Sequence, residues 1–272
     1  MPLTTAQKLS FIEDGYLKLP GAVSDELVAA ARRAINTTLG TDGIDKDQIV
    51  TYQSQSWTPA LRDSPAITDL FNKSTLKPTL IAALGGTPDE AVFGDDNEVG
   101  GGQIALRFPL GEEEAKRVEA QPEAARWGGH MDGLHTATNG VPKGVLGTFT
   151  CLVGVALSEQ ATPFCGELGV LKGAHKINEQ FFRRQKATGD GSVGPGGDGW
   201  PLTGDGAPSD YIPPPLRDEL ADAPGSVVNG GKISPLPTQL MMSPGDAVLV
   251  HYCTPHGNVP APRQISINWC MN

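Results

Sequence analysis

The sequence predicts a single α+β domain, residues 1–272, in which helices come first and short antiparallel strands follow. Apolar residues at helical spacing dominate residues 1–95, whereas alternating and β-branched patterns bounded by Gly and Pro dominate residues 101–272. Helices followed by many short strands are typical of α+β domains, and such strands favour a sandwich or a jelly roll. We therefore expect one domain with its helices packed on one sheet.

The helical part begins with clear start and stop signals. In TTAQKLSFIEDG a threonine can cap the first turn, Leu9 and Ile12 lie at helical spacing, and Gly15 ends the helix. YLKLPG is then expected to be a short strand. In SDELVAAARRAINTTLG the N-cap is Ser24, acidic residues occupy the first turn and one face is apolar. Two shorter helices are expected in SPAITDLFN and LKPTLIAAL.

Strand patterns follow from residue 101 onward. GQIALRFPL alternates, GVLGTFTCLVGVAL is rich in β-branched and apolar residues, and GELGVLKGAH is short and bounded by glycine. Near the end, DAVLVHYC and RQISINWCM are expected strands. In the last one Ile265, Ile267 and Trp269 alternate with polar residues, as in an antiparallel strand with one buried face.

Residues 189–215 form a Gly- and Pro-rich stretch that we interpret as an insertion into this core. Gly raises the entropy lost on ordering and Pro removes hydrogen-bond donors, so regular structure is disfavoured there. Loops of this length are usually functional or disordered, and Trp200 and Tyr211 could cover an apolar substrate. Calcium loops are disfavoured, because the acidic residues lack the regular spacing of oxygen ligands.

The composition excludes several classes of protein. The chain carries 31 Asp and Glu against 21 Lys and Arg without a dense basic tract, which disfavours nucleic-acid or anionic-membrane partners. Its four cysteines form no CxxC pair, which argues against a zinc knuckle or disulfide framework and fits a reducing cytoplasm. No secretory signal or membrane span is visible. We therefore expect a cytoplasmic protein with a small-molecule substrate.

Candidate metal ligands occur in two short segments. WGGHMDGLHT contains His130 and Asp132, which project to the same side of a strand edge, although a His-x-Asp pair alone is common by chance. DAVLVHYCTPHGN adds His256 at the end of a late strand. Two histidines and one carboxylate leave coordination positions open, as in non-haem Fe(II) oxygenases. Arg263 follows on the next strand, and its guanidinium suits a carboxylate.

Together these segments resemble the phytanoyl-CoA dioxygenase family of Fe(II)/2-oxoglutarate-dependent oxygenases. FIEDGYLKLPGAVSDELVAAARRAI is similar to that family's opening helix, strand and second helix, and HMDG matches its His-x-Asp segment. VGVALSEQATPFCGELGVLKGAHK resembles its paired core strands, without the proline and serine of the usual turn. MSPGDAVLVHYCTPHGNVPAPRQISINW matches its closing block. The resemblance covers most of the chain outside residues 40–95 and 189–215.

The resemblance implies a double-stranded β-helix (a cupin-like jelly roll) and a dioxygenase that oxidises a small organic substrate, releasing succinate and CO2. Hydroxylation is the first expectation, with desaturation or cyclisation as variants. Fe(II) would be bound by His130, Asp132 and His256. Arg263 and Gln103 would contact 2-oxoglutarate, which is consumed together with O2. Related halogenases lack the carboxylate ligand, so Asp132 implies oxygen transfer. The alternative is a cupin-like metal-binding protein without 2-oxoglutarate-dependent catalysis.

The other three histidines are expected to have structural or loop positions. His251 lies five residues before His256 on the same predicted strand, so alternation places it on the opposite face, where packing is expected. His175 closes the turn after a core strand and is expected to make a structural hydrogen bond. His135 lies beyond the Gly133 turn in a loop.

Overall fold

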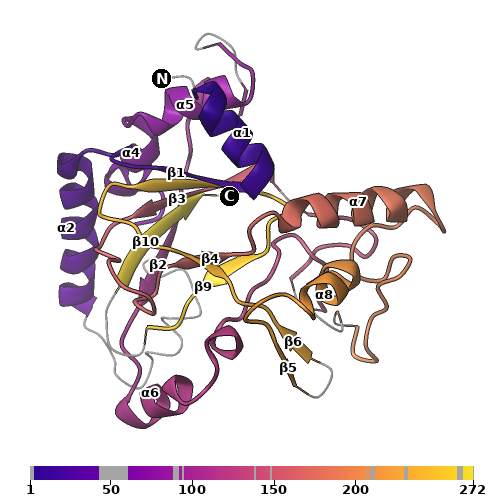
Figure 1. Ribbon diagram of the computed structural model, residues 1–272. Helices are drawn as coiled ribbons and strands as arrows, with labels where there is room; N and C mark the ends of the chain where they lie inside the picture. Colours follow the sequence, from indigo (N-terminus) through magenta and orange to yellow (C-terminus); the bar gives the residue numbers. More distant parts are fainter. Residues whose placement is uncertain are drawn as a thin grey trace.

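The computed structural model describes residues 3–42, 61–87, 92–93, 95–137, 139–147, 149–206, 208, 212–229, 232–261 and 266–271. Its α-helices are α1 (Thr5–Asp14), α2 (Asp25–Asp42), α4 (Pro65–Asn72), α5 (Leu76–Ala83), α6 (Glu112–Glu119), α7 (Ala174–Ala187) and α8 (Pro214–Leu220), with short 3₁₀ turns at Asp95–Asn97 and Glu123–Arg126 (Figure 1). Its strands are β1 (Tyr16–Leu19), β2 (Gln103–Arg107), β3 (Cys151–Ala156), β4 (Leu168–Val170), β5 (Val227–Asn229), β6 (Lys232–Ser234), β7 (Thr238–Leu240), β8 (Ala247–His251), β9 (His256–Asn258) and β10 (Ser266–Met271).

The strands form two main antiparallel sheets and a separate hairpin. The larger sheet has the order β1-β8-β3-β10-β2, and the smaller one has the order β7-β4-β9. Strands β5 and β6 pair only with each other. The α+β prediction is therefore confirmed. Among the described residues, none of the helices is both long and apolar enough to cross a bilayer.

The N-terminal helices cover one face of the five-stranded sheet, as predicted. Ile35 of α2 and Leu70 of α4 belong to the same buried cluster as Val153, Val155 and Leu249 of the central strands. Figure 1 shows α2 and α4 beside this sheet, on the side away from β4 and β9. Because side chains alternate across a strand, these three strand residues share one face of the sheet.

The opposite face of the same strands packs against the smaller sheet. Leu152 of β3 and Val248 and Val250 of β8 form a second buried cluster with Val170 of β4 and Leu240 of β7. Alternate side chains of β3 and β8 therefore pack into two different layers of the core, one on each face of the sheet. Strand β9 directs side chains into the interior between the two sheets, because its His256 pairs with Val170, the β4 residue of this buried cluster.

The loop after α1 brings the N-terminus close to the segment that precedes β9. Thr4 caps α1 in a capping box, and Gly15 ends it with φ 78° while its N–H donates to the Phe11 carbonyl. A Cβ at Gly15 would overlap His175 Nδ1 and would lie 2.5 Å from Thr254 Oγ1. Gly15 is therefore required both for its left-handed backbone and for this close approach.

Gly15→Ala is expected to lower the free energy of unfolding by about 3 kcal/mol, because backbone strain and overpacking add together. Gly21→Ala is the matched control. Gly21 also has a positive φ, 59°, but a Cβ there meets nothing within 4 Å. This control should cost only the backbone strain, about 1 kcal/mol. Urea unfolding of both variants measures the difference, and equal losses would contradict the close packing at Gly15.

The 189–215 insertion is folded against α7 in the part that the structure describes. Trp200 is fully buried, and its ring centroid lies 6.1 Å from that of Phe181. The Gln185 side chain donates to the carbonyls of Gly194 and Asp198 and accepts from the Gly194 N–H. The expectation that Trp200 covers a substrate is therefore wrong, because the indole belongs to the core. Residue 211, the second expected cover, lies outside the described residues.

Candidate metal centre

Main-chain hydrogen bonds join the two segments that carry the predicted ligands. His130 and His256 form an isolated antiparallel bridge, in which each N–H donates to the carbonyl of the other at 2.9 Å. The His-x-Asp segment thus lies beside β9, the edge strand of the smaller sheet. This pairing fixes the spacing of the two histidine backbones without any bound ligand.

The three predicted side chains converge at this point. Asp132 lies between the histidines, with Oδ1 3.6 Å from His130 Nε2 and Oδ2 3.3 Å from His256 Nε2. One ligand atom from each residue lies within 4.8 Å of the others. The side chain of His256 is 7% exposed, whereas that of His130 is 45% exposed. The group is therefore anchored in the interior and open on the His130 side.

Hydrogen bonding sets the tautomer of His256. Its Nδ1 lies 3.0 Å from the Thr254 carbonyl oxygen, which can only accept, so Nδ1 carries the proton. The lone pair of Nε2 then faces the Asp132 carboxylate, which also only accepts. Two acceptors at 3.3 Å need a cation between them, either a proton or a metal ion. A metal-ligating histidine usually has this arrangement, with its second nitrogen held by a carbonyl or carboxylate.

The charge state of Asp132 also suits a metal ligand. Burial by itself would raise the pKa of this carboxyl. When a proton is the cation between the rings and the carboxylate, the hydrogen bonds and positive charge of His130 and His256 outweigh burial and hold the pKa of Asp132 well below its usual range. The carboxylate is therefore ionised at neutral pH. Two imidazoles and one carboxylate form a donor set that fits Fe(II) and leaves coordination positions for other ligands.

A cavity of about 560 Å³ opens directly onto His130 and Asp132. Its apolar wall includes Met131, Leu134 and Ile233, and its other lining residues are Ala125, Trp127, Gly128, Gly129, Gly133, Thr136, Asn139, Ile212, Ser234 and Pro235. Among the described lining residues there is no Lys or Arg. The cavity can therefore hold a largely apolar molecule with a few hydrogen-bonding groups beside the candidate ligands.

Gly129, directly before His130, is explained by the packing of Trp127. This indole is 6% exposed, and its Nε1–H donates to the Gly257 carbonyl at 3.0 Å. A Cβ at Gly129 would overlap the indole ring, and one at Gly169 of β4 would lie 2.8 Å from Nε1. Trp127 thus places a large ring beneath the ligand segments, and only glycine at 129 and 169 leaves room for it.

The two residues predicted to contact 2-oxoglutarate are not brought to this group by the described structure. Gln103 begins β2, pairs with Cys270 and is exposed, and it does not line the cavity. Arg263 lies outside the described residues, between β9 and β10. Their roles stay predictions.

Another arginine, Arg107, which the sequence reasoning missed, contacts the ligand strand. Leu106 belongs to the helix-facing core, so the next residue of β2, Arg107, is on the face that turns toward the smaller sheet. With the Asn258 amide oriented so that its oxygen faces the guanidinium, that oxygen accepts from Arg107 Nε at 3.2 Å and from Nη2. Asn258 is on the same face of β9 as His256. The alternation of side chains along β2 could have indicated that Arg107 lies on this face of the sheet.

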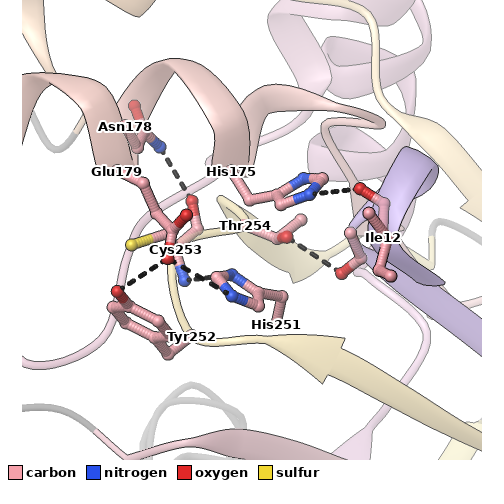
Figure 2. A network of polar contacts seen from close by, with 9 residues as sticks. Ile12, His175, Asn178, Glu179, His251, Tyr252, Cys253 and Thr254 are labelled. Carbon is pink, nitrogen blue, oxygen red and sulfur yellow. Dashed lines mark hydrogen bonds and ion pairs between the residues drawn. The ribbon is translucent and has the colours of Figure 1, made fainter. Parts of the chain in front are cut away.

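Glu179, His251 and Cys253 form a second group of potential ligands (Figure 2). The Cys253 N–H donates to His251 Nδ1 at 3.3 Å, so the imidazole proton is on Nε2, which faces Glu179 Oε1 at 3.7 Å. Tyr252 also donates to Glu179, at 3.0 Å. Burial raises the pKa of the Cys253 thiol to about 12. This group is therefore a hydrogen-bonded network with a protonated thiol. It differs from His256 and Asp132, where two acceptor atoms face each other.

The remaining histidines have packing or hydrogen-bonding positions. His251 lies among the rings of Phe11, His175 and Tyr252, so its expected packing is confirmed. The expectation that it shares a strand with His256 is wrong, because His251 ends β8 and His256 begins β9 of the other sheet. The predicted structural hydrogen bond of His175 is confirmed, since Nε2 lies 2.9 Å from the Ile12 carbonyl (Figure 2). His135 Nδ1 contacts the Val141 carbonyl within its loop.

The chain matches no protein-family model and no curated protein sequence. Solved structures are similar to it in fold. One is the non-haem α-ketoglutarate-dependent carbocyclase SnoK from nogalamycin biosynthesis, with 15% identity and a TM-score of 0.51 over 98% of this chain and 82% of that one. Another is HygX from Streptomyces hygroscopicus with nickel and 2-oxoglutarate bound, with 15% identity and a TM-score of 0.50 over 99% and 86%. EctD from S. alaskensis with 2-oxoglutarate and 5-hydroxyectoine has 17% identity and a TM-score of 0.51 over 98% and 74%. The chain therefore has the fold of these 2-oxoglutarate-associated proteins and brings a His-Asp-His group together within it.

Proposed function

We propose that this protein is a non-haem Fe(II)- and 2-oxoglutarate-dependent dioxygenase with a double-stranded β-helix core. The observation that carries the proposal is the pair of facing acceptors, His256 Nε2 and the ionised Asp132, with His130 completing the group at the edge of a cavity. When bound, the iron would supply dioxygen activation coupled to conversion of 2-oxoglutarate to succinate and CO2. The resemblance of the sequence to the phytanoyl-CoA dioxygenase family supports the same function.

Within this function, the protein's own groups orient the reactants. His256, held by the Thr254 carbonyl, and Asp132 are proposed to bind the metal from the interior, and His130 from the open side. The apolar wall of Met131, Leu134 and Ile233 would keep water from the reacting carbon of the substrate. Hydroxylation is the proposed outcome, with desaturation or cyclisation as related outcomes of the same site.

The proposed substrate is a small, uncharged organic molecule that is mostly apolar. The cavity volume suits such a ligand, and Thr136, Asn139 and Ser234 offer hydrogen bonds near the rim. A CoA thioester would need cations for its phosphates, and the described lining has none. A cytoplasmic location is also proposed, because Cys151, Cys165 and Cys253 are free thiols.

Anaerobic Fe(II) titration with and without 2-oxoglutarate tests the proposal. A visible charge-transfer absorption that needs both components, together with succinate release in air, is the expected result. Metal binding without that absorption would favour the alternative, a cupin-like metal-binding protein without 2-oxoglutarate-dependent catalysis. Screening candidate substrates for coupled succinate release would then identify the substrate.

Arg263 is proposed to hold the distal carboxylate of 2-oxoglutarate, with Gln103 as a further contact. Arg263→Met is expected to raise the dissociation constant for 2-oxoglutarate about 10- to 100-fold, because a charge-assisted hydrogen-bond pair is lost. Arg107→Met is the matched comparison, since Arg107 already binds the Asn258 amide, and it should change that constant less than about threefold. The reverse order of effects, measured by anaerobic titration of the iron-loaded protein, would assign the carboxylate to Arg107.

A further inference from the structure

Helix α7 places one fully buried amide directly behind the candidate metal centre. Asn178 has no exposed surface, and it lies on the same side of α7 as His175 and Glu179, at helical spacing (Figure 2). A buried amide is costly unless its donors are used, so its contacts indicate what the side chain does.

The donors of Asn178 contact both segments that carry the candidate ligands. Nδ2 donates to the Cys253 carbonyl at 2.8 Å and to Met131 Sδ at 3.2 Å. Met131 lies between His130 and Asp132, and Cys253 lies in the turn between β8 and β9 that leads to His256. One side-chain amide therefore joins two segments that are more than a hundred residues apart in sequence.

The Cys253 turn is also tied to its surroundings on its other sides. The Thr254 hydroxyl donates to the Gly15 carbonyl, and the Tyr252 hydroxyl donates to Glu179 of α7. The Thr254 carbonyl in turn holds Nδ1 of His256. Movement of the Cys253 turn would thus be passed on to the hydrogen bond that sets the tautomer and direction of His256.

We infer that Asn178 is a positioning residue that holds Met131 and the Cys253 turn in place, and through them sets the direction of the Asp132 and His256 side chains and hence the affinity of the site for its metal. The inference rests on the proposed metal centre. The paired bonds between His130 and His256 fix their backbones, whereas Asn178 fixes the side chain of Met131 and the turn before His256. Metal sites tolerate ligand displacements of only about 0.2 Å, and outer contacts of this kind change metal affinity about 10- to 100-fold when lost.

Gln185 provides a matched control on the same helix. It is also a fully buried amide of α7, but its hydrogen bonds go to Gly194 and Asp198 in the insertion. Asn178→Ala and Gln185→Ala should therefore lower the stability of the metal-free protein by similar amounts. Only Asn178→Ala should weaken Co(II) binding, by about 10- to 100-fold, while Gln185→Ala stays within about twofold of the wild type.

The experiment uses Co(II) alone, without 2-oxoglutarate or substrate, in competition with a chromogenic chelator. The visible spectrum of bound Co(II) reports ligand geometry and should change in Asn178→Ala but not in Gln185→Ala. If Asn178→Ala does not fold, Asn178→Leu keeps the branched shape and the number of heavy atoms but removes the hydrogen bonds, and the same result is expected. Equal affinity losses in the Asn178 and Gln185 variants, or an unchanged spectrum, would overturn the inference. Failure of the wild type to bind Co(II) would instead overturn the proposed metal centre.

Discussion

Asp132→Ala is expected to abolish product formation and to weaken Fe(II) binding by at least about 100-fold, because an ionised ligand is lost from the centre of the group. Asp132 is the only carboxylate in the described structure that faces both His130 and His256. Equilibrium titration with Fe(II) under anaerobic conditions measures the affinity, and succinate release measures turnover.

Asp246→Ala is a suitable control for this prediction. Its carboxylate accepts from the Gly21 and Ser243 N–H groups at 2.9 and 3.0 Å, away from the candidate ligands. The variant should lose stability but keep the Fe(II) affinity of the wild type.

A halide test adds a second check on Asp132. The wild type with excess chloride or bromide should give no halogenated product, and such a product would show that Asp132 is not an iron ligand.

Trp127→Ala should have the largest effect on stability, about 3–5 kcal/mol, since a buried indole is removed without a replacement. The ring packs in one cluster with Leu171, Ile212 and Val259 and lies against Gly129, which precedes His130. Metal affinity should fall as well, because the cavity left beneath the ligand segments lets them shift. Urea unfolding measures the first effect and Co(II) titration the second.

Trp127→Phe separates packing from hydrogen bonding. Phenylalanine keeps most of the ring but leaves the Gly257 carbonyl without the indole N–H, so a loss of about 2 kcal/mol is expected. A Trp127→Ala variant within about 1 kcal/mol of the wild type would refute the proposed role of the indole.

The parts of the fold that could be predicted are those with local signals. Caps and apolar spacing predicted α1 and α2, alternation predicted β2 and β10, and β8 was also expected as a strand. The convergence of His130, Asp132 and His256 was also expected, because each lies at the end of a recognisable segment and the resemblance supplied their pairing. Leu9 and Ile12, however, are both more than half exposed, so their helical spacing predicted the helix and not a buried face.

The parts that were missed depend on contacts between distant segments. Helix α7 follows a short strand directly and was taken only as the end of that strand, although Phe181 and Phe182 pack into the core with Trp200. The β5–β6 hairpin, which carries Ile233 of the cavity wall, pairs Asn229 with Lys232, so VVNGGKI contains a two-residue Gly-Gly turn signal that was overlooked. The contacts of Asn178 join different layers, and no local pattern predicts them.

The paired main-chain bonds between His130 and His256 have a thermodynamic consequence for the metal-free protein. Since the backbone of the site is assembled by its own hydrogen bonds, metal capture orders little additional chain. Calorimetry of metal binding should accordingly show a small heat-capacity change, unlike domains whose folding depends on their metal. Treatment with a chelator should leave the far-ultraviolet circular dichroism unchanged. The melting temperature should rise with metal concentration as expected when one metal ion binds the folded protein and not the unfolded chain.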